Sequence, residues 1–178
     1  PLRDGAVFDI GGGSTEILEC RDGEIKQAQS LAVGSLNLFN ECVSKIWPKK
    51  EELKAIIRRV EEALESADLP EERAERACGI GGTARAVLKI SNAYFGKDAE
   101  NRVILPEEIQ EITELLCKRN DQARKLILRA CPDRIHTIIP GALMMNALGH
   151  ALCRDRIFVS QYGVREGYLC HKLLNATI

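Results

Sequence analysis

The segment that most constrains the fold is the run Asp9-Ile10-Gly11-Gly12-Gly13-Ser14-Thr15-Glu16. It ends an apolar stretch over residues 5–10 that predicts a buried strand, and it begins an alternating stretch over 14–20 that predicts a second one. Asp22-Gly23 then predicts a tight hairpin into a third strand over 24–33. A chain that begins in this way is expected to form an antiparallel meander whose first turn is built of glycine.

The same run carries the chemistry. Consecutive glycines let the backbone adopt positive φ angles and bring amides close to a ligand, and a nest of amides binds phosphate. Ser14 adds a hydroxyl donor, and Asp9 and Glu16 can face one cleft across the hairpin. Paired carboxylates beside phosphates suit Mg²⁺, which takes one or two carboxylates and keeps several waters. A tight turn with incidental acids is the alternative, but three glycines exceed what a hairpin needs.

A second glycine turn, Gly81-Gly82-Thr83-Ala84-Arg85, follows a strand predicted over 76–80. The free amides of the helix that starts there could receive phosphate, although plain packing explains a glycine pair equally well. Thr83 is expected to cap a helix over 84–90, with a loop over 92–101. In the third segment, over 160–167, Arg165 and Glu166 could form a structural ion pair or contact a substrate.

The remaining pattern predicts helices between the strands and one more strand over 157–159. These helices are expected over 36–45, from Pro48 to before Leu69-Pro70, from Pro106, over 121–130, over 138–152 and from Gly163 to about Leu174. The fold class is therefore α/β, with a mixed five-stranded sheet of three antiparallel strands and two later ones, flanked by helices. We expect residues 1–178 to form a single domain.

Composition excludes some partners. Lys and Arg number 25 and Asp and Glu 26, a net charge of −1, so there is no basic footprint for duplex nucleic acid or an anionic membrane. No apolar run reaches the roughly 20 residues of a membrane span. The seven cysteines are scattered and lack metal-ligand spacing, which predicts reduced core residues in a cytoplasmic protein.

Taken together, the segments resemble the exopolyphosphatase and guanosine pentaphosphate phosphohydrolase (Ppx/GppA) family of the actin-like ATPase superfold. Residues 9–16 are similar to the family's second phosphate loop, and residues 81–85 to its later glycine motif. Arg134 with Pro140-Gly141-Ala142, followed by residues 160–167, resembles its closing segment. The chain departs from the family at Asn37, where an arginine is usual.

The resemblance implies a ribonuclease-H-like domain that is the C-terminal half of a two-domain phosphatase. The N-terminal domain, which carries the catalytic glutamate, is then expected upstream of Pro1. The implied reaction is Mg²⁺-dependent attack of water on a terminal phosphoanhydride of inorganic polyphosphate or guanosine pentaphosphate.

By this resemblance, Asp9 and Glu16 would be the catalytic and metal-binding residues. The phosphate- and substrate-binding residues would be Gly11, Gly12, Gly13, Ser14, Gly81, Gly82, Thr83 and Arg85. Two other functions stay open: a regulatory module that binds polyphosphate or a nucleotide without catalysis, and a kinase of the same superfold that binds ATP at residues 81–85. A homodimer is also left open.

Overall fold

The glycine-punctuated meander forms in the computed structural model, which describes residues 2–173. Strands β1 (Gly5–Ile10), β2 (Thr15–Arg21) and β3 (Glu24–Leu31) pair as antiparallel neighbours. Asp22 and Gly23 join the last two with φ of 57° and 78°, the left-handed pair that a two-residue type I′ hairpin requires. This part of the prediction is confirmed, with strand ends that differ by one or two residues.

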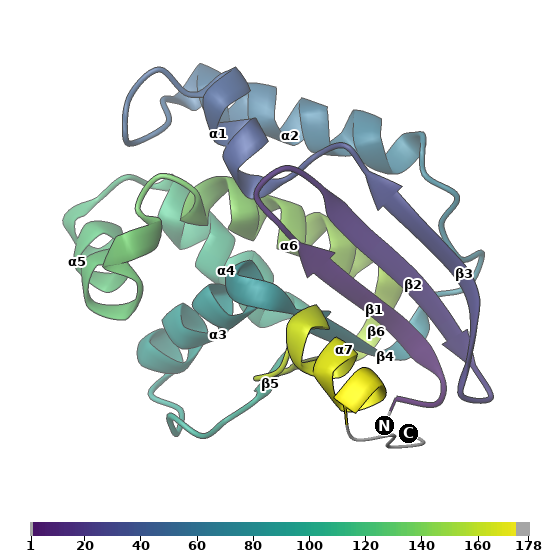
Figure 1. Cartoon of the computed structure of the whole chain (residues 1–178). Helices are drawn as coiled ribbons and strands as arrows, with labels where there is room; N and C mark the ends of the chain where they lie inside the picture. The colour runs from purple at the N-terminus through teal and green to yellow at the C-terminus, as the bar shows by residue number, and fades with distance from the viewer. Residues whose placement is uncertain (1, 174–178) are drawn as a thin grey trace.

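The whole sheet has six strands in the order β3-β2-β1-β4-β6-β5 (Figure 1). The other strands are β4 (Ala74–Ile80), β5 (Val103–Ile104) and β6 (Cys153–Val159). The helices are α1 (Ser35–Cys42), α2 (Lys50–Glu65), α3 (Gly81–Phe95), α4 (Pro106–Cys117), α5 (Asp121–Ala130), α6 (Ile138–Leu152) and α7 (Val164–Leu173), with a 3-10 turn at Pro132–Arg134.

The predicted α/β class with a mixed sheet is confirmed, because β4 runs parallel to both β1 and β6. The strand count of five is wrong. The sixth strand, β5, has only two residues and pairs antiparallel with β6 at the sheet edge. A two-residue strand is too short to show the alternation by which strands are recognised.

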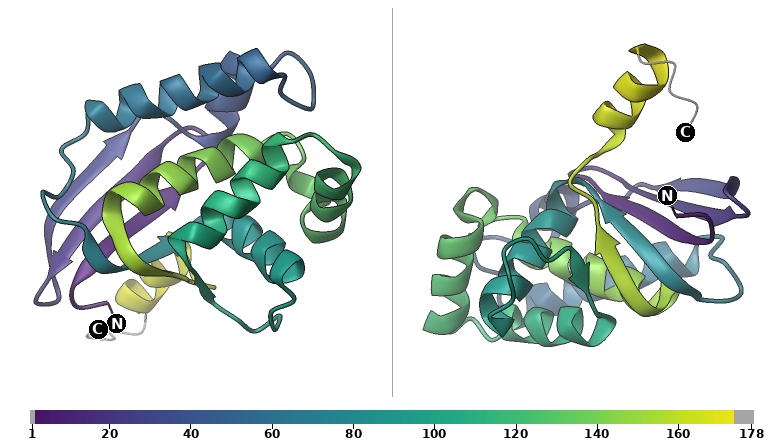
Figure 2. Two further views of the ribbon diagram at one scale, coloured as in Figure 1. Left: turned by 180° about the vertical axis from the view of Figure 1, so that it is seen from behind. Right: turned by 90° about the horizontal axis from the view of Figure 1, so that it is seen from below.

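Helices α1 to α6 cover one face of the sheet, whereas α7 stands clear of the other face (Figure 2). The alternation along β1 follows this layering: Ala6, Phe8 and Ile10 are buried beneath the helices, and Val7 and Asp9 are half-buried on the opposite face. The face that carries Asp9 is thus the open one, so a ligand can reach its carboxylate.

Helix α3 differs from its prediction at both ends. It begins at Gly81 rather than after Thr83, because Gly81 has a φ of +81° and turns the chain straight from β4 into the helix. It also continues to Phe95, through part of the predicted loop. Asn92 is buried in its last turn, and its side-chain amide donates to the Asn101 carbonyl. Asn92 is therefore a helical residue that holds the far end of the following loop.

The C-terminal helix is present, although its predicted last residue, Leu174, lies outside the described residues. The cysteines within residues 2–173 are all free, and burial raises the pKa of the Cys117 and Cys131 thiols to about 11. These two side chains therefore behave as inert packing residues. None of the helices in residues 2–173 has the length and apolarity that a membrane span requires.

Glu52 provides a test of how α2 is anchored. Its carboxylate accepts hydrogen bonds from the Ser44 hydroxyl (2.6 Å) and the backbone amides of Lys49 (2.7 Å) and Ser44 (3.1 Å), which lower the pKa of Glu52 to about 2. A lowered folded-state pKa stabilises the fold above the ordinary value near 4.5, and this stabilisation disappears as the pH falls toward 2.

We expect Glu52→Ala to lower the melting temperature at pH 7 by about 2–4 °C, the effect of losing one helix cap in a chain of this length. Glu61→Ala, on the exposed face of the same helix, is the matched control and should change little. Differential scanning calorimetry at pH 7 and pH 2 measures both variants. Equal melting temperatures for the two at pH 7 would contradict the anchoring role.

Candidate functional site

A cleft of about 530 Å³ lies where the carboxyl ends of β1 and β4 meet. It brings together the first glycine loop, the second glycine turn, the start of α1 and the start of α7. The lining residues are Asp9, Ile10, Gly11, Gly12, Ser35, Leu36, Gly81, Gly82, Thr83, Arg85, Arg134, Thr137, Gly163, Arg165 and Glu166. A larger hollow of about 610 Å³ at the other end of β1 contains none of the predicted site residues.

Helix α1 holds the carbonyls of the glycine loop. The Gly11 carbonyl accepts from the Ser35 amide (2.9 Å) and hydroxyl (3.1 Å), the Gly12 carbonyl from the Leu36 (2.9 Å) and Asn37 (3.0 Å) amides, and the Gly13 carbonyl from Asn37 Nδ2 (3.0 Å). The first-turn amides of α1 are therefore used up on the loop and are not available to an anion.

The same contacts orient the amides of the loop. The described peptide bonds are trans, so each N–H points away from the carbonyl that precedes it. With three successive carbonyls turned toward α1, the N–H groups of Gly12, Gly13 and Ser14 point away from it, and they donate to no acceptor within the described residues. Three adjacent loop amides are thus left without a protein acceptor, as a phosphate-binding nest requires, and Gly12 is the one of the three residues that lines the cleft.

The expected reason for the glycines is wrong, because Gly11, Gly12 and Gly13 are not among the residues with positive φ. The donors of α1 impose the loop conformation instead. Glycine matters more at Gly34, where a Cβ would lie 2.5 Å from the carbonyl carbon and oxygen of Gly12. The helix and the loop can approach this closely only because Gly34 lacks a side chain.

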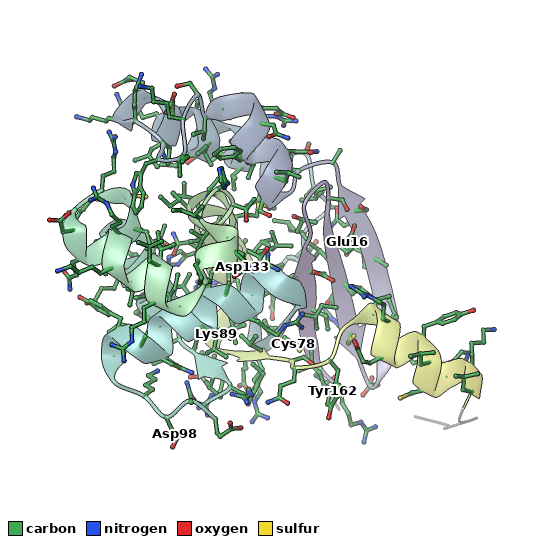
Figure 3. All side chains as sticks on the ribbon, turned by 60° about the vertical axis from the view of Figure 1, so that its left-hand side comes forward. Glu16, Cys78, Lys89, Asp98, Asp133 and Tyr162 are labelled. Atoms are coloured by element: carbon green, nitrogen blue, oxygen red, sulfur yellow. The ribbon has the colours of Figure 1, made fainter. Side chains whose placement is uncertain are left out.

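Asp9 and Glu16 are directly opposite each other across β1 and β2, on the open face of the sheet. Opposed residues of this kind have Cβ atoms about 4.5–5.5 Å apart, so the two carboxylates are neighbours, although only Asp9 is among the residues that line the cleft. Glu16 Oε1 accepts hydrogen bonds from the hydroxyls of Ser14 (2.6 Å) and Ser30 (3.0 Å). The Ser14 hydroxyl thus orients Glu16 rather than pointing at a phosphate. Figure 3 labels Glu16 on its strand.

The two carboxylates are suited to a divalent cation. Burial raises the pKa of Asp9, the charge of Glu16 raises it further, and Arg85 partly lowers it. A cation between them would relieve the repulsion that causes the second effect. Within residues 2–173 no group of three or more His, Cys, Asp or Glu side chains could form a metal cage. A pair of carboxylates with waters is what Mg²⁺ uses, so the residues present fit it.

The second glycine turn lets charged groups approach the start of α3. A Cβ on Gly81 would overlap the Asp9 carboxylate, and a Cβ on Gly82 would overlap the guanidinium of Arg134. Thr83 does not cap the helix: it is buried, and its hydroxyl donates to the Ile10 carbonyl at 2.8 Å. The cap residue has no side-chain bond to the first-turn amides of α3, so these amides remain available to an anion.

Arginines complete the wall of the cleft. Arg85, predicted as a substrate-binding residue, lines it and donates to the carbonyls of Ser160 (3.5 Å) and Gln161 (3.4 Å). Arg134 and Arg165 also line it. For Arg165 the sequence left a structural ion pair and a substrate contact open, whereas Arg134 was not predicted as a site residue. Glu166 accepts from the Gly163 amide at 2.7 Å, and no ion pair with Arg165 is found within residues 2–173.

The raised pKa of Asp9 has a consequence for stability. Between the ordinary value near 3.8 and the raised one, the folded chain holds a proton that the unfolded chain releases, so stability falls as the pH rises through this window. We expect Asp9→Asn to raise the melting temperature at pH 7 by about 1–3 °C, a small effect because the site is half-exposed. The gain should vanish at pH 3. A lower melting temperature for the variant at pH 7 would contradict this.

Comparison with known proteins decides which family the chain belongs to. The family model of the Ppx/GppA phosphatase family matches residues 3–176. The chain belongs to the Ppx/GppA phosphatase family. The resemblance to this family expected from the sequence is thereby confirmed over nearly the whole chain.

Solved structures of Ppx/GppA proteins share the fold. The crystal structure of the Aquifex aeolicus family member is 23% identical, with a TM-score of 0.79 over 98% of this chain and 58% of that chain. An exopolyphosphatase from Cytophaga hutchinsonii is 17% identical, with a TM-score of 0.75 over 96% of this chain and 56% of that one. This Ppx/GppA chain thus spans a little over half the length of these relatives. A search of curated proteins found no significant match.

Proposed function

We propose that this Ppx/GppA domain forms the phosphate-binding half of a phosphoanhydride hydrolase, which releases orthophosphate from the end of polyphosphate or from guanosine pentaphosphate. The observation that carries the proposal is that Asp9, the first part of the glycine loop and three arginines line one cleft. The three unengaged loop amides and Glu16, which is opposite Asp9, adjoin these residues. The proposal includes an N-terminal domain that completes the site. Free cysteines within residues 2–173 support a cytoplasmic location.

In the proposed mechanism the amides of Gly12, Gly13 and Ser14 hold the terminal phosphoryl group. Arg85, Arg134 and the amides at the start of α3 hold the next phosphates of the chain. The water oxygen forms a bond to the terminal phosphorus, the bridging P–O bond breaks, and the bridging oxygen stays on the shortened chain. The water proton goes to the glutamate that the family resemblance assigns to the N-terminal domain.

Asp9 and Glu16 would hold Mg²⁺, which supplies neutralisation of the charge on the phosphate oxygens. Glu16 is held by two serine hydroxyls on Oε1, so its second oxygen is left for the cation or for the attacking water. The near-neutral chain can therefore bind a polyanion by local geometry, without a basic surface.

The alternative function, an ATP-binding kinase, is less well supported by the residues of the cleft. Its lining has three arginines, two carboxylates, glycines, small polar residues and two aliphatic side chains, and no aromatic side chain against which an adenine ring could stack. This composition fits a chain of phosphates better than a nucleoside.

Isothermal titration calorimetry of this chain tests the proposal. The probes are sodium tripolyphosphate, orthophosphate and ATP, each titrated in about 5 mM Mg²⁺. We expect tripolyphosphate to bind at least about tenfold more tightly than orthophosphate, because two anion receptors hold one ligand. No heat of binding at millimolar tripolyphosphate would contradict the proposed site. Tighter binding of ATP than of tripolyphosphate would favour the kinase.

A further inference from the structure

Asn37 makes two contacts with the glycine loop. Its backbone amide donates to the Gly12 carbonyl at 3.0 Å, and its side-chain Nδ2 donates to the Gly13 carbonyl, also at 3.0 Å. One residue in the first turn of α1 therefore fixes two successive peptide groups of the loop. Asn37 is not among the residues that line the cleft, and of the loop only Gly11 and Gly12 are, so the Asn37 side chain contacts the loop just beyond the part that lines the cleft.

The side-chain contact matters because, within the described residues, it is the one hydrogen bond made by the peptide group that joins Gly13 to Ser14. The Gly13 carbonyl has no second donor within the described residues, whereas the Gly11 and Gly12 carbonyls each have two. A Cβ on Gly13 would meet no heavy atom closer than 3.9 Å, which is Asn37 Nδ2 itself. A peptide that follows glycine in open space can rotate easily, and the Asn37 amide prevents this rotation.

We propose that Asn37 is a positioning residue of the phosphate site, whose side chain aims the Ser14 N–H at the bound phosphoryl group. This inference rests on the proposed function. The orientation follows from the trans peptide: with the Gly13 carbonyl held toward α1, the N–H of Ser14 points the opposite way. Without the side chain, the third amide of the nest is no longer fixed, and the ligand must order it on binding.

The neutral side chain distinguishes this role from a direct ionic contact. An arginine or lysine that touched phosphate would contribute a term that salt screens. Asn37 carries no charge, so its contribution should be the same at low and high ionic strength. Replacement by aspartate should be worse than replacement by alanine, because a carboxylate facing the Gly13 carbonyl repels it and favours the rotated peptide.

The test compares Asn37→Ala with Asn40→Ala, which removes the same side chain from an exposed position one turn further along α1. Calorimetry with tripolyphosphate and Mg²⁺ should give an affinity about 3- to 10-fold weaker for Asn37→Ala, the effect of one lost hydrogen bond. The ratio to wild type should stay constant between low and high salt, and Asn40→Ala should bind like wild type. Asn37→Asp should bind more weakly still.

A second readout needs no ligand. In the free chain, the carbonyl carbon resonance of Gly13 and the amide resonance of Ser14 should shift in Asn37→Ala and not in Asn40→Ala. Wild-type affinity in Asn37→Ala, or unmoved resonances, would overturn the inference while the proposed function stands. Failure of the wild-type chain to bind tripolyphosphate would instead overturn the proposed function, and the inference with it.

Discussion

Glu16→Gln in the full-length protein should reduce phosphate release from polyphosphate roughly 100-fold or more. The substitution keeps the shape of the side chain and can keep the hydrogen bonds from Ser14 and Ser30 to the remaining oxygen. It removes the negative charge that, together with Asp9, would hold the cation. The loss should therefore fall on catalysis and metal dependence rather than on folding.

Glu19→Gln is the matched control, since Glu19 lies on the same strand β2 beyond the cleft, where it pairs with Arg21 at 2.6 Å. Phosphate release as a function of Mg²⁺ concentration is the measurement for both variants. The control should follow the wild-type curve. Full activity of Glu16→Gln at the same Mg²⁺ concentration would show that the carboxylate pair is not the metal site.

Gly34→Ala is expected to be the most damaging substitution in the loop region. The backbone at Gly34 is extended (φ −138°), so alanine strains no dihedral angle there. Its Cβ would instead lie 2.5 Å from the carbonyl of Gly12 and 2.7 Å from the amide nitrogen of Gly13. These are backbone atoms that cannot rotate away, so α1 must move off the loop and withdraw the donors that orient the nest.

We expect Gly34→Ala to lower the melting temperature by roughly 4–12 °C and to abolish measurable tripolyphosphate binding. Two control variants distinguish the overlap of the new Cβ with backbone atoms from the effect of replacing a glycine as such. Gly167→Ala in α7, whose Cβ would meet no atom within 4 Å, should leave stability unchanged. Gly82→Ala overlaps only the end of the flexible Arg134 side chain, so it should weaken binding with little loss of stability. Wild-type binding by Gly34→Ala would contradict the loop geometry.

The sequence predicted those elements whose conformation is determined by their own residues. Asp22-Gly23 determines the hairpin through its own backbone angles, and the nearly continuous apolar run over residues 138–152 predicts the limits of α6 without reference to the rest of the chain. The start of α3 could not be predicted in this way. Thr83 is an ordinary capping residue by type, but its hydroxyl is engaged with Ile10, a residue 73 positions away in the sequence.

For the candidate site, too, local features were predictable from the sequence and tertiary contacts were not. The glycine loop and its two carboxylates were visible in eight consecutive residues. The direction of the loop amides could not be predicted, because the donors that fix it come from another element, at Ser35, Leu36 and Asn37. Arg134 and Ser30 were missed for the same reason: each is brought to the site by tertiary structure alone. Spacing in the sequence can indicate a phosphate loop, but not the residues that orient it.

The most direct test is phosphate release from polyphosphate by the full-length protein in ¹⁸O-labelled water with Mg²⁺. If water attacks the terminal phosphorus in this cleft, each orthophosphate released should carry one solvent oxygen, and release should need no acceptor other than water. Glu16→Gln should release almost none. Unlabelled phosphate, or no release by the wild-type protein until a sugar or acid acceptor is added, would contradict hydrolysis at this site.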